Sequence, residues 1–146
     1  MAKTIRRIGI LTGGGDAPGL NPAVRAAVYR AADEHISVVG IYDGWQGLLD
    51  EFAHETWSLD VGTVRHWDRD GGTHLGSSRT NPFRHKNGAA HSDRSAEVVR
   101  NMERLGLDAL IAIGGEDTLG VAKKLADQGA PVVGVPKTID KDLSAT

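Results

Sequence analysis

The chain of 146 residues contains no cysteine, which excludes disulfide bonds and thiolate metal sites. It also lacks an excess of one charge, since 17 Lys and Arg residues stand against 19 Asp and Glu residues and no basic block occurs. We therefore expect no broad binding to nucleic acids or anionic membranes. No apolar run approaches the roughly 20 residues that span a bilayer, and the run after the basic start MAKTIRR is too short for a signal peptide.

Short apolar runs alternate along the chain with amphipathic stretches, which is typical of an α/β fold built from strand–helix–strand units. The apolar runs predict strands over residues 8–11, 37–43, 109–113 and 130–136. The amphipathic stretches predict helices over residues 22–32, 92–105 and 118–127. Asn21 is the expected N-cap of the first helix and Pro22 its first residue. Because the strands are almost continuously apolar, we expect one domain with a doubly wound, mostly parallel sheet covered on both faces.

The segment between these units, residues 44–91, has no clear periodicity and is rich in glycine. We expect a short strand pair or a helix in its first half. Its second half contains GGTHLGSSRTNPFRHKNG, and we expect an exposed functional loop there, because a long glycine-rich segment in a compact domain usually carries a site or is disordered.

The turn TGGGDAPGLN follows the first strand and leads into the first helix. Its glycines let backbone N–H groups approach an anion, which a helix N-terminus also favours. The GK[ST] ending of a Walker A loop is missing, so P-loop nucleotide chemistry is not expected. Two alternatives remain open. One is a purely structural tight turn, and the other is a dinucleotide site, which is a loose match to Gly13, Gly15, Gly19 and Asp43.

A second glycine turn, GGEDTLG, follows the run LDALIAI and places two acids, Glu116 and Asp117, where an anion would be expected. Two carboxylates repel an anion unless a cation intervenes or one of them takes the place of a phosphate. Beyond the last strand, the stretch VPKTIDKD adds Lys137, Asp140 and Asp142. Turns at the carboxyl ends of parallel strands can face one cleft, which would here combine a metal-binding acid, a phosphate-binding cation and a general base.

Five motifs occur in a fixed order: IGILTGGGDAPGLNPAVR, IYDGWQGLL, GGTHLGSSR, IGGEDTLG and PKTIDKD. In this order and spacing they resemble the N-terminal half of a phosphofructokinase, over nearly the whole chain. The resemblance implies transfer of a phosphoryl group to the 1-hydroxyl of fructose 6-phosphate, with Mg²⁺ as cofactor. It also implies a cytoplasmic homo-oligomer with a doubly wound fold.

The resemblance gives roles to individual residues. It assigns contacts with the phosphoryl donor to Gly14, Arg79, Arg84, Gly115 and Thr118. It assigns contacts with the acceptor sugar to Thr138, Asp140 and Asp142. Glu116 stands at the position of the Mg²⁺-binding acid, and Asp140 matches the base that accepts the proton of the attacking hydroxyl.

Asp117 and Lys137 bear on the identity of the donor. Family members that use ATP resemble this sequence with glycine at position 117, whereas members that use pyrophosphate have aspartate there and lysine at position 137. A carboxylate would occupy the place of a nucleotide phosphate and exclude ATP by volume and charge, while the lysine offsets charge on pyrophosphate. We therefore expect pyrophosphate as donor, with an ATP-dependent or mixed-donor enzyme and a non-catalytic phosphate- or nucleotide-binding module as alternatives.

Two features depart from the family pattern. Lys141 stands where the family usually has asparagine, between two aspartates with which it can pair. The sequence also stops at Thr146, whereas family members continue with a part that supplies the arginines and the histidine for the sugar phosphate. We therefore expect the isolated chain to be a donor-binding fragment with negligible activity.

Overall fold

The computed structural model describes residues 3–141 and 143–144, so Asp142 lies outside the described residues. Its centre is a five-stranded sheet in the order β3-β2-β1-β6-β7. The strands are β1 (Arg7–Thr12), β2 (Ser37–Ile41), β3 (Thr56–Leu59), β6 (Ala109–Gly114) and β7 (Val132–Pro136). The pairs β1–β2, β1–β6 and β6–β7 are parallel, whereas β3 runs antiparallel to its neighbour β2. The predicted mostly parallel α/β sheet is confirmed.

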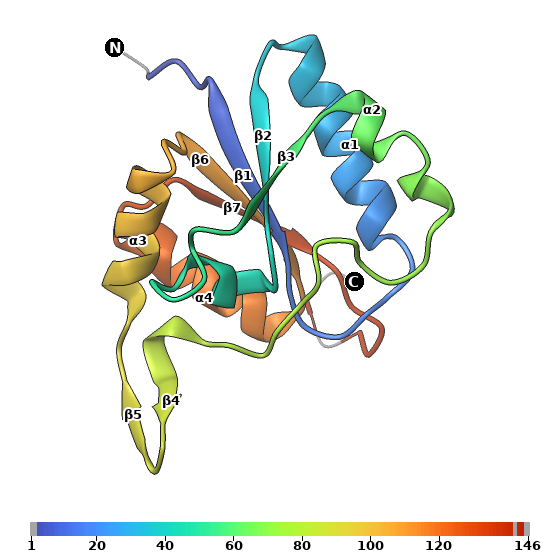
Figure 1. Ribbon diagram of the computed structural model, residues 1–146. Coiled ribbons are helices and arrows are strands. Elements are labelled where there is room, and N and C mark those ends of the chain that lie inside the picture. Colours follow the sequence, from blue (N-terminus) through green and yellow to red (C-terminus); the bar gives the residue numbers. More distant parts are fainter. Residues whose placement is uncertain (1–2, 142, 145–146) are drawn as a thin grey trace.

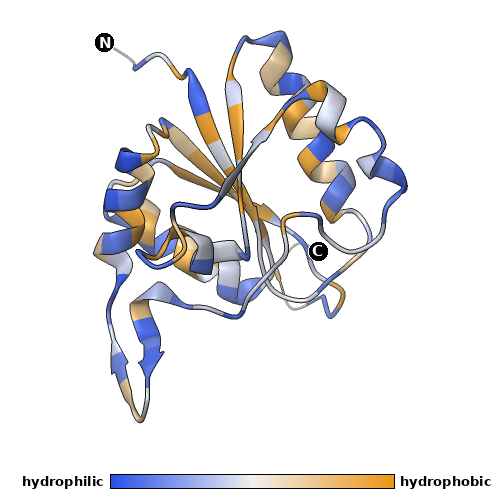
Figure 2. Cartoon of the chain, in the orientation of Figure 1, coloured by the Kyte–Doolittle hydropathy of each residue, from blue (hydrophilic) through white to orange (hydrophobic). Residues whose placement is uncertain are grey.

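Helices cover both faces of this sheet (Figure 1). They are α1 (Leu20–Asp33), α2 (Val61–Val64), α3 (Ser95–Arg104) and α4 (Glu116–Asp127). Successive residues of β1 point to opposite faces, so Ile10 packs in the cluster beneath α1 and Leu11 in the cluster beneath α3 and α4. The hydrophobic residues gather on the strands and on the inward sides of the helices (Figure 2). No helix within residues 3–141 or 143–144 is long and apolar enough to cross a membrane.

The boundaries of the helices differ from the prediction at their starts. The N-cap of α1 is Gly19, in a left-handed conformation with φ 104°, and Asn21 lies inside the helix. The buried Asn21 side chain donates to the Asp70 carbonyl at 3.1 Å and accepts from the N–H of His74 at 2.9 Å, so it fastens α1 to a distant loop. Helix α4 begins at Glu116 rather than Thr118, so both acids of GGEDTLG lie in its first turn.

The segment 44–91 is more regular than expected. Its first half contains the 3₁₀ turn η1 (Gly44–Leu48), the single strand β3, which pairs with β2, and the short helix α2. The alternative of a helix is therefore confirmed, and the alternative of a strand pair within this half is not. The prediction of an exposed loop in its second half is wrong for its last residues, where β4 (His85–Asn87) and β5 (Ala90–Ser92) form a hairpin that stands out from the body (Figure 1). This hairpin also displaces the start of α3 from residue 92 to Ser95.

The last strand β7 is more exposed than the other parallel strands of the sheet. Along β7, Val133 is 60% exposed, and beyond the strand Ile139 is 66% exposed. The strands β1, β2 and β6 are largely buried, as expected. The edge strand β7 is therefore covered less than its apolar sequence APVVGVP predicts.

Candidate active site

Three turns meet at the carboxyl ends of neighbouring strands β1, β6 and β7. The chain after β1 crosses to β2 on one side, whereas β6 lies on the other side, and such a switch point is where open α/β sheets usually bind ligands. The turns are tied together, since Gly13 N–H donates to the Ile113 carbonyl and Lys137 N–H to the Gly114 carbonyl, both at 2.9 Å.

A cavity of about 280 Å³ lies between these turns and is called the donor cavity below. It is lined by Gly14, Gly15, Arg79, Gly115, Glu116, Asp117, Thr118, Lys137, Thr138, Ile139 and Asp140. All the predicted site residues that the structure describes are in this set except Arg84. Ile139 was not predicted, and Gly15 was named only for the dinucleotide alternative, although both lie inside the quoted motifs.

Gly14 is the point where the first turn faces the other two. Its φ is +78°, a conformation that L side chains rarely adopt. A Cβ atom there would lie 3.7 Å from the Lys137 Nζ and 3.8 Å from the Gly115 nitrogen. The Lys137 ammonium also donates to the Gly15 carbonyl. Because Gly14 has no side chain, the Lys137 ammonium and the Gly115 backbone nitrogen both border the space beside Gly14.

The side chain of Thr118 leaves no room for a side chain at Gly13 or Gly114. Its side chain is only 4% exposed and packs between the ends of β1 and β6. A Cβ atom at Gly13 would lie 2.4 Å from the Thr118 Oγ1, and one at Gly114 would lie 2.6 Å from the Thr118 Cβ. The Trp45 indole Nε1 donates to the Thr118 carbonyl at 3.2 Å. The first turn of α4 is therefore built tightly into the glycine turns.

Glu116 and Asp117 are exposed on that first turn, where the partial positive charge of the helix N-terminus favours carboxylates. Within the described part of the chain, no group of three or more His, Asp or Glu side chains could hold a metal ion by itself. Mg²⁺ usually takes one or two carboxylates and completes its shell with phosphate oxygens and water. The exposed Glu116 carboxylate on the wall of the donor cavity fits that requirement if the ligand supplies the phosphate oxygens.

Arg79 reaches the cavity from a loop that is fastened at two points. Thr12 is fully buried, and its Oγ1 donates to the Gly76 carbonyl at 2.7 Å. Ser78 Oγ donates to the Asp43 carbonyl at 2.6 Å, and Asp43 N–H donates to the Leu75 carbonyl. Asp43 thus holds the arginine loop, a role unlike the ribose contact of the dinucleotide alternative.

Arg84 lies outside the donor cavity. It lines a neighbouring cavity of about 550 Å³, which Arg79 also lines and which is called the second cavity below. At the other end of the site, Asp140 lines the donor cavity and is exposed. Lys141 has a φ of 54° and, among the residues that the structure describes, forms no ion pair with an aspartate.

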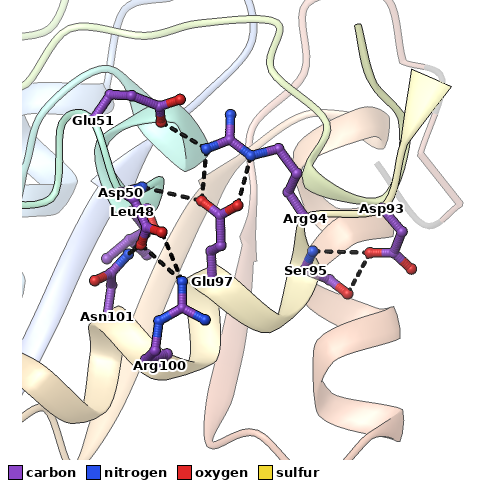
Figure 3. A network of polar contacts seen from close by, with 9 residues as sticks. All are labelled: Leu48, Asp50, Glu51, Asp93, Arg94, Ser95, Glu97, Arg100 and Asn101. Atoms are coloured by element: carbon purple, nitrogen blue, oxygen red, sulfur yellow. Dashed lines mark hydrogen bonds and ion pairs between the residues drawn. The ribbon is translucent and has the colours of Figure 1, made fainter. Parts of the chain in front are cut away.

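An ion network that the sequence interpretation missed supports the segment carrying Trp45 (Figure 3). Arg94 makes two hydrogen bonds of 2.7 Å to the Glu97 carboxylate and one of 2.7 Å to Glu51. These bonds hold the pKa of both carboxyl groups below its usual range. The buried Asn101 donates to the Leu48 carbonyl at 3.0 Å. The network therefore anchors η1 on α3, and the acid three residues after Arg94 was its only sequence signal.

Comparison with known proteins gives a consistent result. A family profile described as phosphofructokinase matches residues 7–146. The chain is 54% identical over 140 residues to the pyrophosphate–fructose 6-phosphate 1-phosphotransferase of Dictyoglomus thermophilum, covering 96% of this chain and 38% of that protein. It is 48% identical over 142 residues to the ATP-dependent 6-phosphofructokinase 3 of Streptomyces coelicolor, covering 96% of this chain and 39% of that protein.

Solved structures show the same architecture. The crystal structure of Pichia pastoris phosphofructokinase in the T-state superimposes with a TM-score of 0.81 at 30% identity, covering 100% of this chain and 18% of that one. The chain thus spans well under half the length of the relatives that it matches. The family profile matches nearly the whole chain, and the turns after β1, β6 and β7 surround the donor cavity. This chain therefore belongs to the phosphofructokinase family.

Proposed function

We propose that this chain forms the donor-binding part of a phosphofructokinase that transfers a phosphoryl group from pyrophosphate to the 1-hydroxyl of fructose 6-phosphate. The observation that carries the donor assignment is the position of Asp117, whose carboxylate lies in the first turn of α4 on the wall of the donor cavity that Lys137 also lines. The high identity to a pyrophosphate-dependent relative supports it.

The donor cavity is lined by positively charged and N–H groups that would lie against the phosphates of a donor. The Gly115 nitrogen and the Lys137 ammonium lie beside the space at Gly14, and Arg79 lines the same cavity. Preorganised donors of this kind stabilise the charge that develops during phosphoryl transfer. Asp117 places a negative charge on the wall of the same cavity. A donor whose third phosphate would lie beside α4, such as ATP, would therefore be repelled.

Asp140 would orient the sugar hydroxyl and hold its proton as the new P–O bond forms, because it is an exposed carboxylate on the wall of the donor cavity. Glu116 would hold Mg²⁺ together with oxygens of the donor. When bound, Mg²⁺ supplies charge neutralisation for the phosphates. Thr138 lines the cavity between Lys137 and Asp140 and would contact the sugar.

Donor choice can be tested by kcat/KM for pyrophosphate and ATP in a chimera that joins this chain to the C-terminal remainder of the Dictyoglomus thermophilum relative. Asp117→Gly removes both volume and charge, whereas Asp117→Asn removes the charge alone and serves as the matched variant. We expect both to shift the donor ratio toward ATP, with the larger shift for glycine. Lys137→Met should lower pyrophosphate turnover by about 10²–10³-fold, the usual effect of losing one transition-state contact.

ATP is the second candidate donor, because relatives at 46–48% identity carry the name ATP-dependent 6-phosphofructokinase. An unchanged donor ratio in both Asp117 variants would favour it over pyrophosphate. A chimera that binds both donors without turnover would instead favour a phosphate-binding module.

A further inference from the structure

Thr12 is the last residue of β1 and is fully buried at the end of the sheet where the three turns meet. Its hydroxyl oxygen lies 2.7 Å from the Gly76 carbonyl oxygen and 2.7 Å from the Thr73 hydroxyl oxygen. A carbonyl oxygen can only accept, so the single Thr12 proton goes to Gly76 and the Thr73 hydroxyl donates to Thr12. One buried hydroxyl thus ties the sheet to two points of the arginine loop, residues 73–79.

The position of the Thr12 hydroxyl is fixed by its surroundings. Strand β1 is the central strand of the sheet, and Thr12 pairs with Ile113 of β6. The β-branched side chain of threonine also has few accessible χ1 rotamers in a strand. The turn after β2 packs against the same residue, since a Cβ atom at Gly44 would lie 3.1 Å from the Thr12 carbonyl oxygen. The hydroxyl is therefore a rigid point from which the arginine loop can be held.

Arg79, at the end of this loop, has no side-chain contact that would fix its direction. It is exposed, and its guanidinium forms no ion pair or hydrogen bond with any residue within 3–141 or 143–144. The reach of the guanidinium into the donor cavity is therefore set by the backbone of the arginine loop. Thr12 provides two of the hydrogen bonds that hold this loop.

We propose that Thr12 is a positioning residue for donor binding, whose hydroxyl holds the arginine loop so that Arg79 reaches the phosphates in the donor cavity. The inference rests on the proposed function, in which Arg79 contacts the donor. Thr12 is fully buried and lines neither cavity, so it acts on the ligand through the arginine loop. Such an anchor matters because a displacement of about 1 Å in a contacting group can lower a reaction rate by about 10²-fold.

Two variants of Thr12 separate the effect of the hydroxyl from that of side-chain volume. Thr12→Val keeps the branched shape and removes both hydrogen bonds, whereas Thr12→Ser keeps the hydroxyl and removes a methyl group. Val28→Ala is the control for a loss of stability alone, because Val28 is 2% exposed on α1 and lines neither cavity. Titration calorimetry with the magnesium salt of pyrophosphate measures binding to each folded variant.

Thr12→Val should weaken pyrophosphate binding by about three- to ten-fold, the scale of a weakened charge contact, while Thr12→Ser and Val28→Ala bind like the unaltered chain. In a chain that carries Arg79→Gln, Thr12→Val should cause no further loss, because the group that it positions is gone. In a chain that carries Lys137→Met, Thr12→Val should keep its full effect, because Lys137 reaches the cavity from the turn after β7.

Amide hydrogen exchange gives a second readout that needs no ligand. The Gly76 N–H donates to the Thr73 carbonyl within the arginine loop, and the Lys137 N–H donates to the Gly114 carbonyl outside it. Thr12→Val should speed exchange at Gly76 and leave exchange at Lys137 unchanged, because only the arginine loop loses its anchor.

Four results would overturn the inference. They are unchanged exchange in the arginine loop, unchanged pyrophosphate binding in Thr12→Val, an equal loss of binding in Thr12→Ser, and losses that add when Thr12→Val is combined with Arg79→Gln. Pyrophosphate binding that depends on Arg79 but not on Thr12 would overturn the inference and leave the proposed donor. Absence of pyrophosphate binding to the unaltered chain would overturn both.

Discussion

Replacing Gly13 by alanine tests how tightly the first turn of α4 is built against the glycine turns. The new Cβ atom would lie 2.4 Å from the Thr118 Oγ1, 3.0 Å from its Cγ2 and 3.3 Å from its Cβ. Thr118 is only 4% exposed, so its side chain cannot move into solvent without shifting α4. Forcing an extra methyl group into such a site costs about 1–3 kcal/mol of unfolding free energy.

A second substitution separates a clash with the outer side-chain atoms from a clash with the Cβ atom. Thr118→Ala removes the two atoms nearest to the new methyl group at position 13 and leaves the contact of 3.3 Å, so Gly13→Ala/Thr118→Ala should recover most of the loss. The same rescue should fail for Gly114→Ala, because its Cβ would lie 2.6 Å from the Thr118 Cβ, which alanine keeps. Thr118 therefore couples strongly to position 13 and weakly to position 114.

Gly120→Ala is the matched control for these variants. It lies on the exposed side of α4, and a Cβ atom there would meet nothing within 4 Å. Alanine in a helix interior should raise the unfolding free energy by about 0.5–1 kcal/mol relative to glycine. Urea unfolding of this chain followed by far-ultraviolet circular dichroism measures all these variants together with Thr118→Ala alone. A Gly13→Ala chain as stable as the unaltered one, or equal rescue at both glycines, would refute the packing argument.

Three further outcomes follow from individual residues. Because the chain spans 38% of the length of its pyrophosphate-dependent relative, we expect the chain on its own to form no measurable fructose 1,6-bisphosphate from either donor. Turnover near the 1–100 per second that is roughly typical of kinases would contradict this expectation. Lys3 and two backbone N–H groups lower the pKa of Asp108 to about 2. The contribution of the Asp108 carboxylate to stability is therefore present above about pH 4 and lost as the pH falls toward 2. The urea midpoints of Asp108→Asn and the unaltered chain should differ at pH 7 and converge near pH 2. Lys141 has a φ of 54°, so Lys141→Gly should raise the midpoint of thermal unfolding, whereas Lys123→Gly inside α4 should lower it, and equal shifts would contradict strain at position 141.

The strands β1, β2, β6 and β7 and the meeting of the three turns could be predicted from the sequence, because both follow from local patterns. Apolar runs such as LDALIAI end in glycine or an acid, and parallel strands place those ends at one edge of the sheet. Gly14, Lys137 and Asp140 therefore came together in one cavity as expected. The start of α1 was mispredicted because Asn21 is a favourable N-cap by type, yet its amide binds a loop some fifty residues away.

The second cavity could not be predicted from the sequence motifs, for a different reason. The resemblance assigned Arg84 to the donor, whereas in the structure the 3₁₀ turn at Pro82–Arg84 leads into a hairpin and Arg84 lines the second cavity. Gly88, with a φ of 62°, is the first of the two loop residues between the paired Asn87 and Ala90, and a glycine at that position was a usable hairpin signal. Only the pairing of Lys86 with His91 shows which side chains share a face, and that pairing depends on register. Spacing along the sequence therefore could not predict that Arg84, Lys86 and His91 line one cavity.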